Sequence, residues 1–340
     1  MHTNLYLVQS PLQAINAFEF RRNQAQQGES NVLAVLDQSW GPNNTMVAAT
    51  LGALDWKPDF VLPYAASRAG KALAWLSLRR FVRSLSSVRR VVIGAYDSGL
   101  MVAVTNLFKE ARVFIVDDGT NSLVFPDYRY LGARGEHHRQ DQVVRWLGFD
   151  SRLPSCVTCF SIYDLPLRAP DRRVKNELSF LKTDLRYEDS GPVFFAGSIF
   201  SDVGMVSHDT YIDWVAAVRT WFGGREMHYF PHRRTNLEVK RKALECLGVR
   251  IVQLDIPFEL HLSQSAVAPC AVAGLYTTIF DTLLAAGLCE PQRLISFVVP
   301  EEVMIDPMER SMARTCYRAY EKAGMRVIDA LPRFTSALQR

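Results

Sequence analysis

Residues 4–26 read NLYLVQSPLQAINAFEFRRNQAQ, and this stretch contains the pattern that decides the fold. It opens with Leu5–Val8, a short apolar run typical of a buried strand, and Pro11 then begins a helical pattern that extends to Gln26. Proline suits the first turn of a helix, because the backbone N–H that it lacks would have no intrahelical partner there. The stretch therefore predicts a strand followed by a helix, as at the start of a βαβ unit.

The same alternation of short β-branched runs and helical patterns continues along the chain, which is typical of parallel sheets flanked by helices. The further predicted strands of the first half are Val32–Leu36, Asp59–Leu62, Arg90–Ile93 and Arg112–Val116, with another helix over Lys71–Leu85. The predicted strands of the second half are Val193–Gly197, Met227–Phe230, Arg250–Leu254, Val267-Ala268 with Ala271-Val272, and Leu294–Val298. A polar, proline-bearing passage between the two series predicts a linker.

These patterns predict an α/β protein with two Rossmann-like domains. The expected plan is an N-terminal domain over residues 1–165, a linker over 166–192, a second domain over 193–310 and a C-terminal helical segment over 311–340 that packs back on the first domain. No Gly-x-Gly-x-x-Gly fingerprint stands in either half, which favours a GT-B arrangement with the two domains facing each other across a cleft.

Composition narrows the class of protein. Of the 340 residues, 48% are hydrophobic and 22% charged, as in a globular protein, and the net charge of +4 is too small to predict binding of nucleic acid. The six cysteines stand mostly in apolar surroundings, and the sequence begins with a strand pattern and contains no apolar run of membrane-spanning length. We therefore expect a cytoplasmic protein, or one peripheral at the inner membrane.

Polar side chains follow two predicted strands of the first half, where ligands of open α/β sheets bind. Ser10-Pro11-Leu12-Gln13 places a hydroxyl and an amide at a helix N-terminus, which suits an anion or a sugar hydroxyl, although simple capping by Ser10 is the more common explanation. Asp117-Asp118-Gly119 places two carboxylates together, and desolvation raises the pKa of such a pair toward that of a general base. An ordinary Asp-Gly turn has the same sequence.

Two polar groups follow strands of the second half. Gly197-Ser198 lets the backbone approach a phosphate, or is a turn that needs a small residue. Pro231-His232-Arg233-Arg234 suits a phosphate, because arginine binds phosphate through two parallel hydrogen bonds and histidine changes its charge near neutral pH. The alternative for this segment is a solvated basic loop, and we prefer the phosphate interpretation.

Two further groups stand near predicted helix starts in the second half. Asp255 and Glu259 suit ribose hydroxyls, and acidic residues in a first helical turn equally stabilise the helix dipole. Thr277-Thr278 provides two hydroxyls at a helix N-terminus, where a single hydroxyl suffices for capping. The second threonine therefore favours an anion site.

The order of these short motifs resembles the bacterial sialyltransferase and polysialyltransferase superfamily. Those proteins are inverting GT-B transferases that use a CMP-activated sugar acid and carry an Asp/Glu-Asp-Gly motif, a His-Pro motif and a Ser-Ser/Thr motif. The counterparts here are Asp117-Asp118-Gly119, His232 and Thr277-Thr278, so the resemblance covers most of the chain, to about Ala286. It implies transfer of a sialic-acid-like sugar to a glycan hydroxyl of a capsule, lipopolysaccharide or other surface glycan.

The resemblance also implies roles for individual residues. Asp117 is the expected base that deprotonates the acceptor hydroxyl, Asp118 supports the loop or the acceptor, and His232 contacts the CMP phosphate and assists its departure. The implied CMP-sugar contacts are Gly197, Ser198, Pro231, Arg233, Glu259, Thr277 and Thr278, and the implied acceptor or sugar contacts are Ser10, Pro11, Gln13 and Gly119. The first domain would thus bind the acceptor and the second the CMP sugar. No Asp-x-Asp motif is evident and CMP carries one phosphate, so we expect no metal or other cofactor.

Several alternatives stay open. His232 is followed by Arg233 where the family has proline, and the hydroxyl pair is Thr-Thr, so the donor is a CMP-sialic acid, another CMP-nonulosonate or CMP-Kdo. A non-catalytic nucleotide- or glycan-binding protein of polysaccharide assembly would not need Asp117. A sugar-nucleotide epimerase of the same fold would bind UDP instead of CMP.

Residues 71–90 combine leucines with arginines in a basic amphipathic pattern. Such a pattern suits contact with an anionic membrane or a polyanionic glycan, while a surface helix that packs on its own sheet is the more common explanation. The acceptor, the linkage and the oligomeric state have no signal in the sequence.

Overall fold

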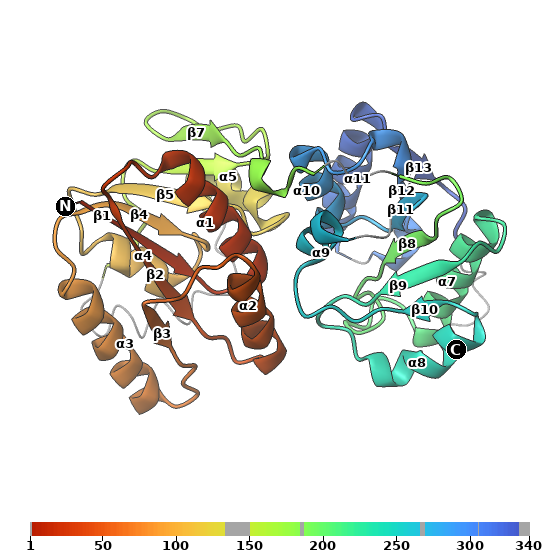
Figure 1. The fold of residues 1–340 in the computed structure, drawn as a ribbon, viewed down its shortest axis with the longest axis horizontal. Helices are drawn as coiled ribbons and strands as arrows, with labels where there is room; N and C mark the ends of the chain where they lie inside the picture. The colour runs from red at the N-terminus through yellow and green to blue at the C-terminus, as the bar shows by residue number, and fades with distance from the viewer. Residues whose placement is uncertain (1, 133–149, 184–186, 266–268, 305, 333–340) are drawn as a thin grey trace. The chain divides into compact units, whose positions relative to one another are not determined.

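The computed structural model of the chain describes residues 2–132, 150–183, 187–265, 269–304 and 306–332. The chain divides into two compact units, one comprising Met1–Phe180 with Asp255–Pro257 and the other Leu181–Leu254 with Phe258–Arg340. Each unit contains one parallel β-sheet with helices packed on it (Figure 1). The predicted fold class of two Rossmann-like α/β domains is confirmed.

The first unit contains a seven-stranded sheet in the order β3-β2-β1-β4-β5-β6-β7. Its strands are β1 (Thr3–Val8), β2 (Ser30–Leu36), β3 (Phe60–Leu62), β4 (Val88–Ile93), β5 (Arg112–Val116), β6 (Thr158–Ser161) and β7 (Arg172–Lys175). Its helices are α1 (Pro11–Gln24), α2 (Gly41–Ala53), α3 (Arg68–Arg83), α4 (Gly99–Thr105) and α5 (Asn121–Leu131). All of the strand pairs are parallel, as the alternation of strands and helices predicts.

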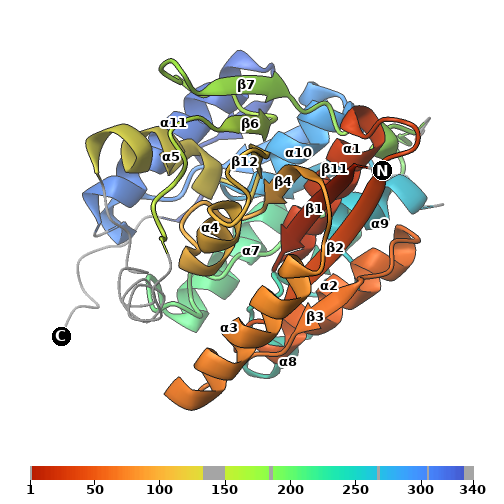
Figure 2. The ribbon, with the colours of Figure 1, turned by 90° about the vertical axis from the view of Figure 1, so that its left-hand side faces the viewer.

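The central strand β1 explains how the helices divide between the two faces of this sheet. All six residues of β1 are buried, and successive side chains point to opposite faces. Leu5 and Leu7 lie in one apolar cluster with residues of α3 and α4. Tyr6 points the other way and packs edge-on against Phe20 of α1, with 6.2 Å between the ring centroids. Helices α1 and α2 accordingly cover one face and α3 and α4 the other (Figure 2).

The second unit contains a six-stranded parallel sheet in the order β10-β9-β8-β11-β12-β13. Its strands are β8 (Val193–Ala196), β9 (Met227–Phe230), β10 (Arg250–Ile251), β11 (Ala271–Gly274), β12 (Leu294–Phe297) and β13 (Arg326–Ile328), and its helices are α7 (His208–Trp221), α8 (Leu237–Cys246), α9 (Phe258–Gln264), α10 (Thr278–Ala286) and α11 (Pro307–Lys322). Short 3₁₀ turns η1 (Ser179–Leu181), η2 (Pro291–Arg293) and η3 (Glu301–Val303) complete the described elements. Neighbouring residues Phe194 and Phe195 of β8 contact Phe230 and Tyr229 respectively, so aromatic packing supports both faces.

Two features differ from the predicted domain plan. Arg172–Lys175 falls inside the predicted linker 166–192 but forms β7, which pairs with β6 at the edge of the first sheet. In the predicted C-terminal segment 311–340, α11 and β13 belong to the second unit, where β13 pairs with β12. Both strands are short and lie at a sheet edge, with three of the four residues of β7 and one of the three residues of β13 exposed, so neither contains the apolar run by which central strands are recognised.

Candidate active site

The strand order places the candidate residues at the switch point of each sheet. In the first unit β1 lies between β2 and β4, and in the second β8 lies between β9 and β11. The chain leaves these central strands toward opposite sides, and the crevice that this opens at their carboxyl ends is where open α/β sheets bind ligands. The residues after β1, β4 and β5 are therefore the candidate site residues of the first unit, and those after β8, β9 and β11 are the candidate site residues of the second.

Asp117 directly follows β5, and both oxygens of its side chain accept hydrogen bonds from other residues of the first unit. Its two carboxylate oxygens accept hydrogen bonds from Ser161 Oγ and from the backbone N–H of Ile162, both at 2.7 Å. Its own carbonyl oxygen accepts a hydrogen bond from Asn16 Nδ2 of α1 at 3.1 Å. The residue is 2% exposed, and burial raises the pKa of its carboxyl to about 6 although the hydrogen bonds oppose the rise. Asp117 thus joins the ends of β5 and β6 to α1.

Asp118 has a different environment from its neighbour. It is partly exposed, and its Oδ1 accepts a hydrogen bond from Ser10 Oγ at 2.9 Å. The Asp118 backbone N–H donates to Ser122 Oγ at 3.1 Å, and Gly119 then adopts a φ of +67°, a conformation that glycine tolerates best. The turn holds one carboxylate inward and leaves the next at the surface.

Ser10 both caps a helix and contacts the acidic pair. Its Oγ accepts a hydrogen bond from the N–H of Gln13 at 3.2 Å, as a helix N-cap does, while its hydroxyl hydrogen points to Asp118. The capping explanation is therefore confirmed, while contact of Ser10 with an anion or a sugar hydroxyl stays a prediction. A residue that follows β1 thereby fixes the orientation of a carboxylate that follows β5.

The other residues predicted to contact the acceptor lie inside this corner. Pro11 is buried, and Gln13 is 0% exposed, with its Oε1 accepting a hydrogen bond from the N–H of Gln9 at 2.8 Å. A Cβ at Gly94, after β4, would lie 2.2 Å from that same Oε1. Pro11 and Gln13 therefore lie in the interior of the unit, where Gln13 supports the loops after β1 and β4.

Two residues after β4 belong to the site although the sequence analysis did not single them out. Tyr96 donates a hydrogen bond to the carbonyl oxygen of Asn121 at 3.0 Å. Burial raises the pKa of its hydroxyl, and the carboxylates of Asp97 and Asp118 raise it further, so both acids lie near the phenol. The sequence could have indicated both residues, because Tyr96 and Asp97 come soon after the predicted strand Arg90–Ile93, just as Asp117 comes directly after its own predicted strand.

His232 follows β9 in the second unit, and its ring has a defined hydrogen-bonding state. Nδ1 accepts a hydrogen bond from the backbone N–H of Arg234 at 3.1 Å. Burial lowers the pKa of the imidazole to about 4, and the nearby charges of Arg233 and Arg234 contribute to the lowering. The ring is therefore neutral at pH 7, and with Nδ1 as acceptor its proton is on Nε2. His232 presents a neutral hydrogen-bond donor, with Arg233 and Arg234 following it in the same loop.

The backbone N–H groups of the loop after β8 donate hydrogen bonds to other residues of the second unit. Gly197 N–H donates to the carbonyl oxygen of Phe230 at 2.8 Å, and Ser198 N–H donates to the hydroxyl of Tyr211 at 2.9 Å. A Cβ at Gly197 would lie 2.6 Å from the hydroxyl oxygen of Tyr229, so this turn requires a glycine for steric reasons. The expectation that these backbone groups cradle a phosphate does not fit this geometry, while the Ser198 hydroxyl is buried and has no hydrogen-bond partner among the described residues.

A buried ion pair ties this loop to the loop that contains His232. One oxygen of Asp202 accepts a hydrogen bond from the backbone N–H of Asn236 at 2.9 Å, and the other contacts Lys240 Nζ at 2.6 Å. The side chain of Lys240 is fully buried, and its Nζ lies 4.8 Å from the ring centroid of Tyr211. Because Tyr211 also accepts the Ser198 N–H, the pair fixes the loops after β8 and β9 to each other.

The predicted hydroxyl pair lies where β11 leads into α10. Thr277 is the N-cap, and its Oγ1 accepts a hydrogen bond from the N–H of Ile279 at 3.3 Å. Thr278 is the first residue of the helix and is partly exposed. One threonine therefore serves as the cap and the other presents a second side chain at the same helix start.

Glu259 lies in the first turn of α9 and is 5% exposed. Burial raises the pKa of its carboxyl, while hydrogen bonds from its own N–H and from Thr282 and the charge of Arg233 act in the opposite direction. The carboxylate thus lies near the charge of Arg233 within the second unit, and its place in the first turn of α9 fits stabilisation of the helix dipole, while a ligand contact stays a prediction.

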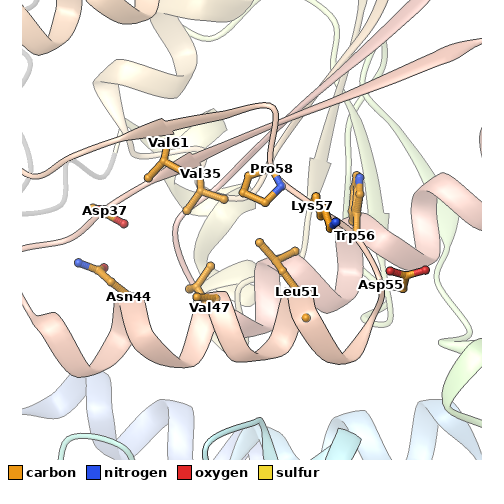
Figure 3. A pocket seen from close by; sticks show the side chains of 12 residues that line it. Val35, Asp37, Asn44, Val47, Leu51, Asp55, Trp56, Lys57, Pro58 and Val61 are labelled. Atoms are coloured by element: carbon orange, nitrogen blue, oxygen red, sulfur yellow. The ribbon is translucent and has the colours of Figure 1, made fainter.

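A pocket of about 300 Å³ lies between α2 and the strands β2 and β3 (Figure 3). Its walls are mainly apolar, with Val35, Val47, Leu51 and Val61 among them, and Asp37 and Asn44 stand together at one end. Asp37 follows β2, so this polar end lies one strand from the loop after β1. Gln38 Nε2 bridges the two strand ends through a hydrogen bond to Gln9 Oε1 at 3.2 Å.

Among the described residues, no group of three or more His, Cys, Asp or Glu side chains is arranged to hold a metal ion. The polar groups at the two switch points are carboxylates in the first unit and imidazole, guanidinium and hydroxyl groups in the second. This set suits proton transfer on one unit and binding of an anion on the other.

The fold defines a protein of the GT-B type, and solved structures of that type align over nearly the whole chain. UDP-GlcNAc 2-epimerase from Neisseria meningitidis, bound to UDP-GlcNAc, aligns with a TM-score of 0.52 and 9% identity over 97% of this chain and 96% of that one. UDP-GlcNAc 2-epimerase from Methanocaldococcus jannaschii aligns with a TM-score of 0.54 and 11% identity over 94% and 92%. MnaA from S. aureus, in a structure with UDP, gives 0.56 and 11% over 87% and 79%. No protein-family model matches the chain. At these identities the likeness is one of fold.

Proposed function

We propose that this chain is a glycosyltransferase that transfers a sialic-acid-like sugar from a CMP-activated donor to a glycan hydroxyl. The observation that carries the proposal is the contrast between Asp117 and Asp118 at the end of β5, where one carboxylate is enclosed and the other is partly exposed and oriented by Ser10. The order of motifs along the sequence supports a CMP sugar, and the GT-B fold is compatible with any nucleotide-sugar enzyme.

Within this proposal we assign the base to Asp118 in place of Asp117. A general base must reach the acceptor hydroxyl, and both oxygens of Asp117 already accept hydrogen bonds from Ser161 and Ile162. Asp118 is accessible, and the hydrogen bond from Ser10 restricts the orientation of its carboxylate. Asp117 then acts as a positioning residue, because it fixes the backbone from which Asp118 projects.

The reaction is a direct displacement. The acceptor O–H gives its proton to the Asp118 carboxylate while the acceptor oxygen bonds to the anomeric carbon of the donor. The bond from that carbon to the CMP phosphate oxygen breaks, and the electron pair leaves with CMP. His232 donates a hydrogen bond through Nε2–H to the departing phosphate, and Arg233 provides positive charge beside it. The hydrogen bond from Nε2–H becomes stronger as negative charge develops on the departing phosphate.

The test is a screen of activated donors with the purified full chain. CMP-sialic acid, other CMP-nonulosonates and CMP-Kdo are incubated with a panel of glycan acceptors, and release of CMP is followed. We expect release with at least one CMP donor, a loss of at least 100-fold in Asp118→Ala and in His232→Ala, and an unchanged rate in Asp213→Ala, which removes an exposed carboxylate from α7. Release of CMP from none of the donors would favour a non-catalytic binding protein.

A second candidate is a UDP-sugar epimerase, since the solved structures that align with the chain include UDP-GlcNAc 2-epimerases. The two functions differ in the nucleotide and in the need for an acceptor. Thermal unfolding with CMP and with UDP separates them, because a bound nucleotide raises the melting temperature by mass action. Protection by CMP alone supports the transferase, and protection by UDP together with turnover of UDP-GlcNAc without an acceptor supports the epimerase.

A further inference from the structure

Helix α3 has a second apolar surface besides the one that packs on the sheet. The inward side chains Trp75, Leu78 and Val82 are buried, and Phe81 stacks on Phe60 of β3 with 4.5 Å between ring centroids. These contacts account for the packing of the helix on its own sheet. Figure 2 shows α3 on the outside of the first unit, beside β3.

The outward side of α3 carries leucines where a solvated helix would carry polar residues. Leu73 is 67% exposed and Leu76 is 55% exposed. Arg80 and Arg83 follow them at a spacing of i, i+3, i+7 and i+10, which places all four side chains on one stripe of the helix. At 100° per residue this stripe lies opposite the buried side chains of Trp75, Leu78 and Val82.

The segment of the chain that contains this stripe is positively charged. Residues 60–96 contain no Asp or Glu and seven basic residues, namely Arg68, Lys71, Arg79, Arg80, Arg83, Arg89 and Arg90. Glu29 pairs with the last two. Arg68, Arg80 and Arg83 are exposed and make no ion pair with the described residues. The outer surface of α3 is therefore both apolar and cationic.

We propose that α3 docks the protein on an anionic lipid surface, with Leu73 and Leu76 inserted among the acyl chains and the arginines at the level of the phosphates. Charge complementarity selects an anionic partner, and the two leucines select a bilayer over a soluble polyanion, because a polyanion offers no apolar phase to cover them. No helix in the described ranges is long and apolar enough to cross a membrane. Because one side of α3 packs on the sheet and the opposite side carries Leu73 and Leu76, we expect the helix to lie in the plane of the interface.

Flotation of the full chain with vesicles tests the proposal independently of any enzymatic activity. We expect binding to vesicles of 70% phosphatidylcholine and 30% phosphatidylglycerol at 50 mM salt, and at least tenfold less binding to pure phosphatidylcholine. The pair Leu73→Ser and Leu76→Ser, and separately the pair Arg80→Gln and Arg83→Gln, should each weaken binding at least tenfold. The helical signal in circular dichroism should not change, because none of these four side chains packs on the sheet.

Matched controls remove similar groups from α8 and β10 in the second unit. Val239→Ser removes an apolar side chain that is 53% exposed, and the pair Lys242→Gln and Arg250→Gln removes two exposed charges. Both controls should bind vesicles within twofold of the wild type. The proposal is overturned by absence of binding to the anionic vesicles. It is equally overturned if dextran sulfate binds as tightly as the vesicles and the leucine pair has no effect, which would identify a polyanionic glycan as the partner.

Discussion

Replacing each carboxylate at the end of β5 by its amide separates the chemistry of Asp118 from the structural role of Asp117. In Asp118→Asn the amide oxygen can still accept the hydrogen bond from Ser10, so we expect the free energy of unfolding to change by less than about 1 kcal/mol. The variant cannot take a proton from the acceptor. Loss of a general base lowers kcat by about 10²- to 10⁴-fold.

Asp117→Asn affects folding in a way that depends on pH. The new NH₂ group replaces one of the two acceptor oxygens, so either the hydrogen bond from Ser161 or the one from Ile162 is lost, which costs about 1–3 kcal/mol. Removal of a buried charge acts in the opposite direction at pH 7, where the wild-type carboxyl, with its pKa raised to about 6, is ionised. As the pH falls, the folded wild type takes up a proton before the unfolded chain does and gains stability, whereas the variant does not.

The stability gap between wild type and Asp117→Asn should therefore be wider at pH 5 than at pH 7.5. A carboxyl with a pKa of about 6 in the folded state and 3.8 in the unfolded state widens the gap by about 1.4 kcal/mol over this range. Urea unfolding at the two pH values measures the gap, and CMP release at pH 7.5 measures kcat, which we expect to fall less than tenfold. A kcat that drops 100-fold in Asp117→Asn and stays near the wild type in Asp118→Asn would refute the assignment.

Three further perturbations test other contacts of the two switch points. The folded-state pKa of His232, about 4, makes the wild type lose stability as the pH falls below 6.5, whereas His232→Gln has no such loss. The unfolding free energy of the variant relative to the wild type should therefore rise by at most about 2 kcal/mol between pH 7.5 and pH 5. An equal difference at both pH values would contradict the buried neutral ring. Lys240→Met should destabilise the protein by about 3–5 kcal/mol, because it leaves Asp202 without its ion-pair partner, and it should raise the KM for the donor more than it lowers kcat. Adding Asp202→Asn to the same chain should recover most of the stability. Denaturation measures the stability, and initial rates measure KM and kcat. Gly94→Ala should cost about 1–3 kcal/mol because its Cβ meets the Gln13 amide, and thermal unfolding in a Gln13→Ala background should show most of that loss restored.

The sequence predicted the strands that contain a clear apolar run and missed β6, β7 and β13, which lack one. Strands such as β1 and β5 are buried on both faces, so their apolar runs stand out from the helical patterns around them. The edge strand β7 reads Arg-Arg-Val-Lys and is largely exposed, so the same criterion passes over it. Strand β6 is buried but reads Thr-Cys-Phe-Ser, so only its two central residues are apolar.

The missed strand β6 also explains why the sequence could not choose between the two carboxylates. Ser161 and Ile162, the two partners of Asp117, lie at the end of β6, 44 and 45 residues away along the chain. The partner of Asp118 is Ser10, 108 residues away. These contacts depend on β1, β5 and β6 lying in one sheet, which the local pattern around Asp117 does not contain. The general location at a strand end was predictable, and the division of roles was not.

The structure also shows why a raised pKa is a poor guide to the base at such a site. Successive residues at the end of a strand point to opposite sides, so of two adjacent acids one turns toward the fold and the other toward the crevice. The inward acid has the higher pKa because burial raises it, as in Asp117, yet the same burial separates it from a substrate. Accessibility and a fixed orientation are the properties that a base needs before its pKa matters, and at this strand end they belong to Asp118 through its contact with Ser10.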